Sequence, residues 1–363
     1  MKKRVVVAMS GGVDSSVTAH LLKEDGFEVI GATMRVWKET IQKGLDRCCG
    51  ASDVEDARHV AQKLGIPFYV FNMEEEFEKE VIQYFCKEYG KGRTPNPCIL
   101  CNEKIKFNSF LRKALDLEAD FIATGHYARL EFDETMKRYL LKKGLDSKKD
   151  QSYVLFSLTQ NQFSRALLPL GHFEKEEVRM KALQLGLRVH DKPESQEICF
   201  IHELSYHSFL RERLGGAVES GSIVDRRGNV LGKHKGIPFY TIGQRRGLGL
   251  AKGKPLYVTG IDRDKNQIIV GEEADVYAES FLVDSVNWIN DPLAGPSISA
   301  QVKIRYNHPG AVASLFIKEN KEVLVTFRSP QKAITPGQAA VFYDGEIVLG
   351  GGWIREVVKP DKM

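Results

Sequence analysis

Three of the six cysteines in this sequence lie in segments that favour thiol chemistry. Cys98 and Cys101 are three residues apart in the stretch GRTPNPCILCNEKIKF, at the start of a predicted helix. Cys199 lies far along the chain in SQEICFI, with apolar residues beside it. A helix N-terminus stabilises a thiolate, which is the form of cysteine that acts as a nucleophile or as a metal ligand. These three side chains are therefore candidates for either role.

Two kinds of metal site can be considered for these cysteines, an iron–sulfur cluster and a zinc site. Cys98, Cys101 and Cys199 together are candidate ligands of an iron–sulfur cluster. One C-x-x-C with a single distant cysteine is incomplete for zinc, and the histidines show no metal-ligand spacing. We expect Cys48 and Cys49, which are adjacent ahead of another predicted helix, to be ordinary loop thiols. We therefore predict no dedicated metal site and keep the cluster as the alternative.

A second stretch with chemical potential is VVVAMSGGVDSSVTAHLL, which runs from Val5 to Leu22. An apolar run breaks into a Gly-rich turn and then resumes with apolar residues at helical spacing, which predicts a strand, a turn and a helix. Glycines let backbone N–H groups approach a ligand closely, and a helix N-terminus favours negative charge. The stretch therefore predicts a phosphate-binding site.

The turn differs from two well-known phosphate-binding loops. It lacks the lysine of G-x-x-x-x-G-K-[ST], and it does not contain the dinucleotide fingerprint G-x-G-x-x-G. What remains is a pyrophosphate cradle made of backbone amides and serine hydroxyls. Within it, we expect Asp14 to be free to help hold a magnesium ion.

Length and composition indicate a globular protein of two or three domains. With 363 residues, of which 42% are hydrophobic and 28% charged, the chain is too long for one ordinary core and unlike a disordered segment. The net charge of +4 permits an anionic partner such as RNA. The apolar run at the N-terminus is shorter than a signal peptide needs, and no stretch approaches the ~20 apolar residues of a membrane span. We predict a cytoplasmic protein with no membrane partner, whose cysteines do not form a disulfide scaffold.

The elements that must position these residues fall into three regions. Strand and helix patterns alternate up to about residue 120, which is typical of a parallel sheet with helices on both faces. After about residue 193 the chain becomes basic and Gly-rich, and short alternating strands from about 255 to 358 are typical of a small β-barrel. We expect an α/β N-terminal domain, a small central domain and a C-terminal all-β, barrel-like domain. The predicted boundaries are 1–205, 206–278 and 279–363.

The stretch SGGVDSS directly after a strand resembles the PP-loop of the ATP pyrophosphatases, which cleave ATP between the α and β phosphates and transfer AMP to a carbonyl oxygen. Together with TPNPxxxCN and EICFI, it makes the chain similar to the tRNA-specific 2-thiouridylases, which replace the C2 oxygen of the wobble uridine with sulfur. Further matches, in chain order, are TGHYAR, KDQSY, IGQRRGLG and TPGQAAVFYDGEIVLGGGWI. The resemblance implies an adenine nucleotide α-hydrolase-like fold for the N-terminal domain.

The resemblance also implies how the thiols act. The cysteine that matches Cys199 carries a persulfide, and the one that matches Cys101 acts as the nucleophile that releases its sulfur. A transient disulfide between them then needs a reductant. The implied partners are the tRNA substrate and a persulfide donor, either a cysteine desulfurase or a sulfur relay protein. The implied cofactors are ATP and Mg²⁺.

Binding residues follow from the same matching, position by position. ATP is expected to contact the strand end and turn, one residue of the next strand, and a glycine that ends a later strand: Ala8, Met9, Ser10, Gly11, Gly12, Val13, Asp14, Ser15, Met34 and Gly125. The tRNA is expected to contact five separate stretches, through Asn96, Pro97, Cys98, His126, Lys149, Asp150, Gln151, Arg305, Tyr306 and Gln338. Some family members carry Asp where this chain has Cys98, so the base-contacting role of that position differs here.

Two other functions stay open at this point. A PP-loop ATP pyrophosphatase acting on a small molecule would share SGGVDSS but would need neither the paired thiols nor a terminal β domain. A non-catalytic RNA-binding module would use the nucleotide site only for structure or regulation. Neither alternative would use every one of the motifs that this chain carries in order.

Overall fold

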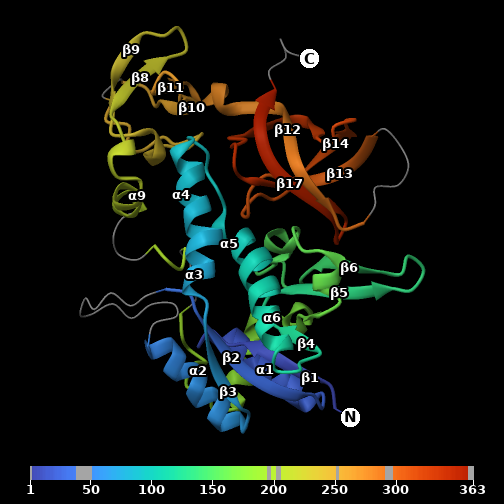
Figure 1. The fold of residues 1–363 in the computed structure, drawn as a ribbon. Helices are drawn as coiled ribbons and strands as arrows, with labels where there is room; N and C mark the ends of the chain where they lie inside the picture. The colour runs from blue at the N-terminus through green and yellow to red at the C-terminus, as the bar shows by residue number, and fades with distance from the viewer. Residues whose placement is uncertain are drawn as a thin grey trace. The chain divides into compact units, whose positions relative to one another are not determined.

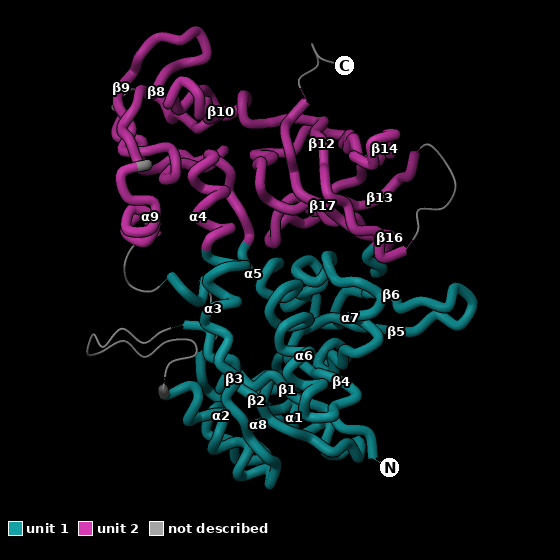
Figure 2. The backbone as a smooth tube through the Cα atoms, viewed as in Figure 1, with its two compact units in different colours: residues 1–82, 97–202, 346–348 teal, residues 83–96, 203–345, 349–363 magenta. Residues whose placement is uncertain are grey.

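The computed structural model describes residues 2–37, 51–193, 198–201, 206–250, 253–290 and 297–358, so Cys48 and Cys49 lie outside the described residues. The chain forms two compact units (Figure 2). Unit 1 comprises Met1–Ile82, Pro97–His202 and Glu346–Val348, and unit 2 comprises Gln83–Asn96, Glu203–Gly345 and Leu349–Met363. In the described ranges, every helix is too short or too polar to traverse a lipid bilayer.

Unit 1 is built around a five-stranded parallel sheet (Figure 1). Its strands are β1 (Arg4–Ala8), β2 (Glu28–Arg35), β3 (Phe68–Asn72), β4 (Phe121–Ala123) and β7 (Ala166–Leu167). The strand order is β3-β2-β1-β4-β7, and all neighbours are parallel. The chain moves outward from β1 through β2 and β3 and then adds β4 on the other side of β1. Open α/β sheets bind ligands at such a reversal, beyond the carboxyl ends of the strands.

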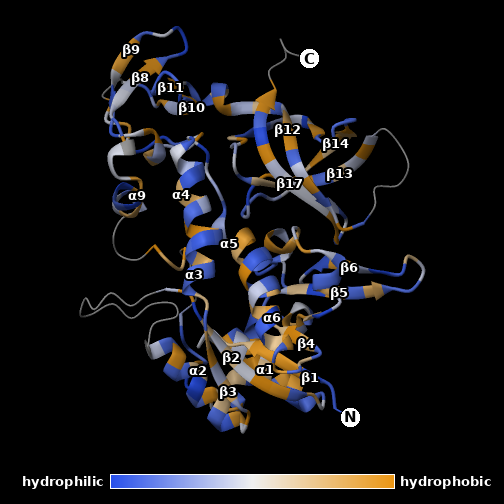
Figure 3. Ribbon diagram, viewed as in Figure 1, coloured by the Kyte–Doolittle hydropathy of each residue, from blue (hydrophilic) through white to orange (hydrophobic). Residues whose placement is uncertain are grey.

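Helices cover both faces of this sheet. On one face, Val5 of β1, Val17 of α1, Ala61 of α2 and Val178 of α8 are fully buried in one core. On the other face Val6 is also fully buried, because successive strand residues point to opposite sides. Figure 3 shows the apolar residues along β1 and β4. The α-helices of unit 1 are α1 (Val13–Glu24), α2 (Ala51–Leu64), α3 (Glu74–Phe77), α5 (Pro97–Leu100), α6 (Phe110–Leu115), α7 (Gln160–Phe163) and α8 (Lys175–Gln184).

Two segments of unit 1 are π-helices and two are 3₁₀-helices. They are the π-helices η1 (Glu78–Ile82) and η2 (Cys101–Ser109) and the 3₁₀-helices η3 (Ser152–Leu155) and η4 (Pro169–His172). An antiparallel hairpin, β5 (Ala128–Asp133) and β6 (Arg138–Lys143), follows strand β4. In this unit, Lys142 of the hairpin pairs with Ile347. The sequence analysis did not predict the hairpin or the π-helices.

Unit 2 contains a four-stranded sheet and a closed barrel. The sheet has the order β10-β11-β8-β9, with β8 (Gly221–Asp225), β9 (Val230–His234), β10 (Tyr257–Asp262) and β11 (Gln267–Gly271). Its helical segments are α4 (Gln83–Gly90), α9 (Tyr206–Leu214), η5 (Gly215–Ala217), η6 (Ile237–Phe239) and η7 (Glu273–Val276). The strands β10 and β11 therefore pair with the strands of the basic, Gly-rich region and not with the barrel.

Six strands form the barrel in the order β12-β15-β14-β13-β16-β17, and β12 pairs with β17 to close it. They are β12 (Tyr277–Trp288), β13 (Ser297–Lys303), β14 (Ala311–Ile317), β15 (Val323–Lys332), β16 (Ala339–Asp344) and β17 (Ile347–Val358). Alternate residues such as Val302, Leu315 and Phe342 are fully buried inside it. The predicted fold class, an α/β domain followed by a small central domain and a β-barrel, is confirmed.

Candidate active site

The turn after β1 depends on one glycine. Gly11 has a φ of +72°, and a Cβ at this position would lie 2.3 Å from the backbone oxygen of Asp53 in α2. Gly12 differs, because a Cβ there would meet only the Ser10 hydroxyl, at 3.5 Å. Because Gly11 has no side chain, the backbone of the turn packs directly against the backbone of α2.

The serines of the turn fix its shape and leave backbone donors exposed at the helix start. The Ser10 N–H donates to Ser15 Oγ at 3.1 Å, and Ser16 Oγ donates to the Gly12 carbonyl at 2.8 Å. No side chain of the described residues caps α1, whose N-cap is Gly12. The first N–H groups of a helix have no partner within the helix, so this turn presents donors that suit a phosphate group.

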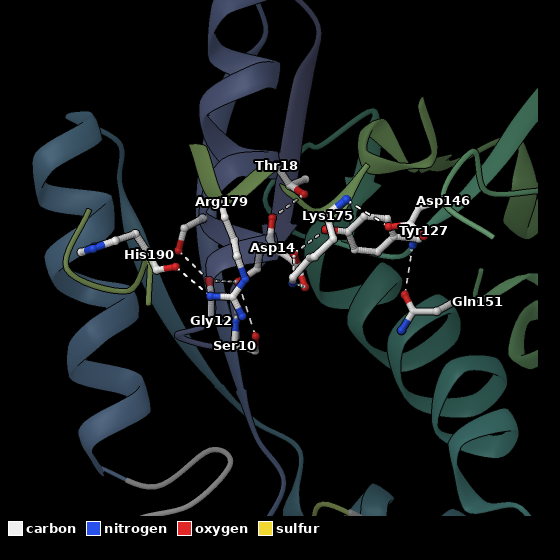
Figure 4. A network of polar contacts seen from close by, with 12 residues as sticks. Ser10, Gly12, Asp14, Thr18, Tyr127, Asp146, Gln151, Lys175, Arg179 and His190 are labelled. Atoms are coloured by element: carbon white, nitrogen blue, oxygen red, sulfur yellow. Dashed lines mark hydrogen bonds and ion pairs between the residues drawn. The ribbon is translucent and has the colours of Figure 1, made fainter. Parts of the chain in front are cut away.

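Asp14 is not free to hold a magnesium ion, contrary to the expectation from the sequence. Its carboxylate accepts hydrogen bonds from Tyr127 Oη at 2.7 Å and from Lys175 Nζ at 2.7 and 2.8 Å (Figure 4). The residue Lys175 begins α8, is only 4% exposed and donates its backbone N–H to Asp146 at 3.1 Å. Both oxygens of Asp14 are therefore engaged, and the residues present offer Mg²⁺ no open carboxylate here. The sequence analysis did not single out Lys175, because it stands far from the turn in an ordinary charged helix.

Gly125 brings the end of β4 against the start of α1. A Cβ on Gly125 would lie 2.9 Å from the Asp14 Cβ and 3.0 Å from the Ser15 nitrogen. Gly125, the predicted ATP contact farthest along the sequence from the turn, therefore meets Asp14 and Ser15 in space, at the point where the strand order reverses. Of the other predicted contacts, Ala8 and Met9 are buried, and Met34 is half-buried near the carboxyl end of β2.

Lys192 ties a second segment to the turn. Its Nζ donates to the Gly11 carbonyl at 3.2 Å and to the carboxylates of Asp53 and Asp56 at 2.6 Å each. Burial opposes the charge of this lysine, but the hydrogen bonds to the two carboxylates raise its pKa. The chain that leads to Cys199 is thus anchored at the phosphate-binding turn. The lysine had no recognisable signal in the sequence.

The thiol pair lies where α5 runs into the π-helix η2. Cys98 is exposed and Cys101, the first residue of η2, is half-buried. Burial raises the pKa of both thiols, and the charge of Lys106 opposes that rise. Burial and the charge of Lys106 therefore act in opposite directions on these thiols, and the effect of burial is the larger.

Cys199 is half-buried in a segment that packs on the same helical layer as Cys101. Its neighbour Phe200 makes an edge contact with Phe77 of α3, with ring centroids 5.7 Å apart. The helix α3 in turn packs against η2, which begins at Cys101. Among the described residues, no three or more His, Cys, Asp or Glu side chains are arranged to hold a metal ion. The iron–sulfur alternative therefore has no support in this part of the chain.

Several predicted tRNA contacts of unit 1 help to shape the local backbone. His126 is buried, and burial lowers its pKa well below the usual value, so its ring is neutral. The Gln151 side-chain oxygen accepts from the Tyr127 N–H at 3.0 Å (Figure 4). Asp150 accepts from the N–H groups of Gly144 and Ser152 at 3.2 and 3.0 Å, so its carboxylate shapes the local loop. The remaining predicted contacts in this unit are Pro97, which is buried, and Lys149, which is half-buried.

The predicted tRNA contacts in unit 2 have separate surroundings. Tyr306 is 37% exposed, and Arg305 donates to the Lys332 carbonyl at 3.1 Å. Gln338 donates from its side chain to the Thr94 carbonyl at 2.8 Å, two residues before the half-buried Asn96. The roles of these residues stay predictions.

We expect Gly11→Ala to lower the free energy of unfolding by about 1–3 kcal/mol, because alanine is strained at positive φ and its Cβ would collide with the Asp53 carbonyl. Gly12→Ala is the matched control and should cost less than about 1 kcal/mol, as an N-cap substitution without a clash. Urea unfolding monitored by circular dichroism measures both. Equal losses for the two variants would contradict the assignment of Gly11 as the required glycine.

Three family models match consecutive parts of the chain. They are described as the tRNA methyl transferase HUP domain (residues 3–203), the tRNA methyl transferase PRC-barrel domain (207–272) and the aminomethyltransferase beta-barrel domain (278–354). The first alone covers more than half of the sequence.

Curated relatives match over almost the whole length. A tRNA-specific 2-thiouridylase MnmA of Halothermothrix orenii is 53% identical, covering 97% of this chain and 99% of the relative. The protein of the same name from Acetivibrio thermocellus is 51% identical, covering 98% and 99%. A third, MnmA 1 of Caldanaerobacter subterraneus subsp. tengcongensis, is 52% identical, covering 99% and 100%. With such identity over nearly every residue, this chain belongs to the tRNA-specific 2-thiouridylase family.

Proposed function

We propose that this chain catalyses the ATP-dependent 2-thiolation of the wobble uridine of tRNA. The relatives named tRNA-specific 2-thiouridylase support the reaction. The observation that carries the proposal for these residues is a pair of contacts on either side of Cys199 in the sequence. Lys192 donates to the Gly11 carbonyl in the turn after β1, and Phe200 packs on α3, which contacts the helix that begins at Cys101.

The first step activates the uridine. The C2 oxygen of the base attacks the α-phosphorus of ATP, and pyrophosphate leaves, so that the oxygen becomes part of an AMP leaving group. The N–H groups at the start of α1 bind the phosphates, and the residues that contact ATP are those predicted from the sequence, Ala8 to Ser15, Met34 and Gly125. The first step is necessary because oxide is a very poor leaving group, whereas AMP leaves readily.

The second step transfers sulfur. Cys199 carries the persulfide, and the Cys101 thiolate attacks its Sγ, which breaks the persulfide S–S bond and forms a Cys101–Cys199 disulfide. The released sulfide adds to C2 of the activated base, and the C2–O bond breaks with loss of AMP. A thiol reductant then supplies two electrons to restore both cysteines. The mechanism therefore consumes one ATP and one persulfide sulfur for each modified uridine.

Further components of the proposal follow from this reaction. Mg²⁺ would enter with ATP and would supply positive charge to the phosphates, because both oxygens of Asp14 already accept hydrogen bonds from Lys175. A cysteine desulfurase or sulfur relay protein supplies the persulfide. The tRNA contacts are Asn96, Pro97, Cys98, His126, Lys149, Asp150, Gln151, Arg305, Tyr306 and Gln338. The chain divides into domains with the boundaries 1–205, 206–278 and 279–363. The enzyme acts in the cytoplasm, where its tRNA substrate is found.

The test of the function uses the purified full chain with ATP, Mg²⁺, a sulfide source and unmodified tRNA, followed by nucleoside mass spectrometry. We expect 2-thiouridine together with AMP and pyrophosphate. Cys101→Ser and Cys199→Ser should each abolish 2-thiouridine while tRNA binding in a gel shift stays within about twofold, because each removes one of two required sulfurs. Cys86→Ala, at a buried cysteine of α4, is the control that keeps activity. Robust thiolation by either serine variant would remove the two-cysteine mechanism, and AMP formation without any 2-thiouridine would remove the function.

A second prediction concerns the ion pair beneath the turn. We expect Lys175→Met to weaken ATP binding about tenfold, or ~1.4 kcal/mol, because the Asp14 carboxylate would then face the polyphosphate without its cation. Isothermal titration with ATP measures the effect, and Lys181→Met on the same helix is the control.

The double variant Asp14→Asn/Lys175→Met separates charge balance from simple loss of packing. Removing both charges should restore part of the ATP affinity that the single Lys175→Met variant loses. A double variant that binds ATP no better than the single one would contradict the charge-balancing role.

A further inference from the structure

The thiol helix has an unusual register. The π-helix η2 begins at Cys101, and at its end the Phe110 N–H donates to the Ile105 carbonyl five residues earlier. In such a helix the residue at i+5 lies one turn after residue i, where an ordinary α-helix would place i+4 or i+3. Lys106 is therefore one π-turn after Cys101 and lies toward the same face. π-helical segments of this kind are rare and often occur at functional sites.

Lys106 also lacks a counter-ion in the described part of the chain. No carboxylate of the described residues lies within ion-pair distance of its Nζ, although the side chain is half-buried. Its neighbour Lys104 behaves differently, since it pairs with Glu103 at 2.7 Å. A half-buried ammonium group without an anion nearby costs free energy, unless an anion comes close to it during the reaction.

The charge of Lys106 acts on the thiols and on few other groups. Lys106 lowers the pKa of Cys98 and Cys101, against the larger effect of burial, and it also lowers the pKa of the buried His126. The elements packed against η2 are α3, η1, α5, α6 and η3.

Of the titratable groups on those elements, Cys98 raises the pKa of Cys101. The other titratable groups there are the carboxylates and the lysine of residues 74–80, the cations Arg112 and Lys113, and Tyr153. Lys106 is therefore the one cation among the described residues that favours the ionised form of this thiol.

We infer that Lys106 is a positioning residue whose charge favours the thiolate form of Cys101 for sulfur release. This inference rests on the proposed function for its purpose, since Cys101 must attack the Cys199 persulfide as a thiolate. The lysine contacts neither the base nor ATP in this role; it acts only through the charge that it places one π-turn from the nucleophile. The Cys101 proton leaves to solvent before the attack, and the thiolate then supplies the electron pair that forms the new S–S bond.

The experiment measures the ionisation of Cys101 without requiring catalysis. The reduced full chain is pulsed with iodoacetamide across pH 6–10, and modification of Cys101 is read separately from that of Cys98 by peptide fragmentation in a mass spectrometer. In Lys106→Met, the alkylation rate of Cys101 at pH 8 should fall about threefold to tenfold, as for a pKa rise of ~0.5–1 unit, and the profile should move to higher pH. Lys106→Arg should keep the rate within about twofold.

Lys104→Met is the matched control, because it removes a cation that is already paired with Glu103. If Lys106→Met fails to fold, as judged by circular dichroism, Lys106→Gln provides the second neutral variant. An unchanged Cys101 profile in a folded neutral variant would overturn the inference, whether or not the chain thiolates tRNA. Absence of 2-thiouridine with the unaltered chain would instead overturn the proposed function and leave the alkylation result to stand by itself.

Discussion

The site depends on close backbone contact at the turn between β1 and α1. On one side Gly11 meets the Asp53 carbonyl of α2, and on the other Gly125 meets the first turn of α1. Neither contact leaves room for a Cβ, so the helix start is fixed between α2 and the end of β4. Because a helix N-terminus binds anions only where its N–H groups are held in place, this packing determines where a phosphate can bind.

Both lysines beside the turn are paired with carboxylates, two lysines against three aspartates. Lys175 pairs with Asp14, and Lys192 pairs with Asp53 and Asp56, so neither lysine presents an unopposed positive charge. The preference for an anion must therefore come chiefly from the backbone N–H groups of α1. Such a cradle does not hold its ligand with a lysine, which agrees with the absence of the lysine-containing loop from this sequence. The same lysines instead fix α8 and the segment before Cys199 against the turn.

The sequence predicted the local elements of the site but did not predict the contacts between residues that are far apart in the chain. The strand, turn and helix around Gly11 could be identified because apolar spacing and glycine carry that information. The pairing of Asp14 with Lys175 could not, since 161 positions separate the two residues and no local pattern connects them. The π-helical register at Cys101 was missed for a different reason: one additional residue per turn leaves no signature in a short apolar pattern. The π-helical register places Lys106 one turn after Cys101.

Burial raises the pKa of the Cys98 and Cys101 thiols, and the residue at position 98 further affects how easily Cys101 ionises. Burial raises the pKa of Cys98, so at neutral pH this side chain is an uncharged thiol and a weak hydrogen-bond donor. A carboxylate at this position would place a negative charge beside Cys101 and would further oppose ionisation of that thiol. With Cys98 there, Lys106 acts against burial and against the smaller effect of Cys98 itself. A cysteine at position 98 thus opposes ionisation of Cys101 less than a carboxylate would, although it still raises the pKa of that thiol.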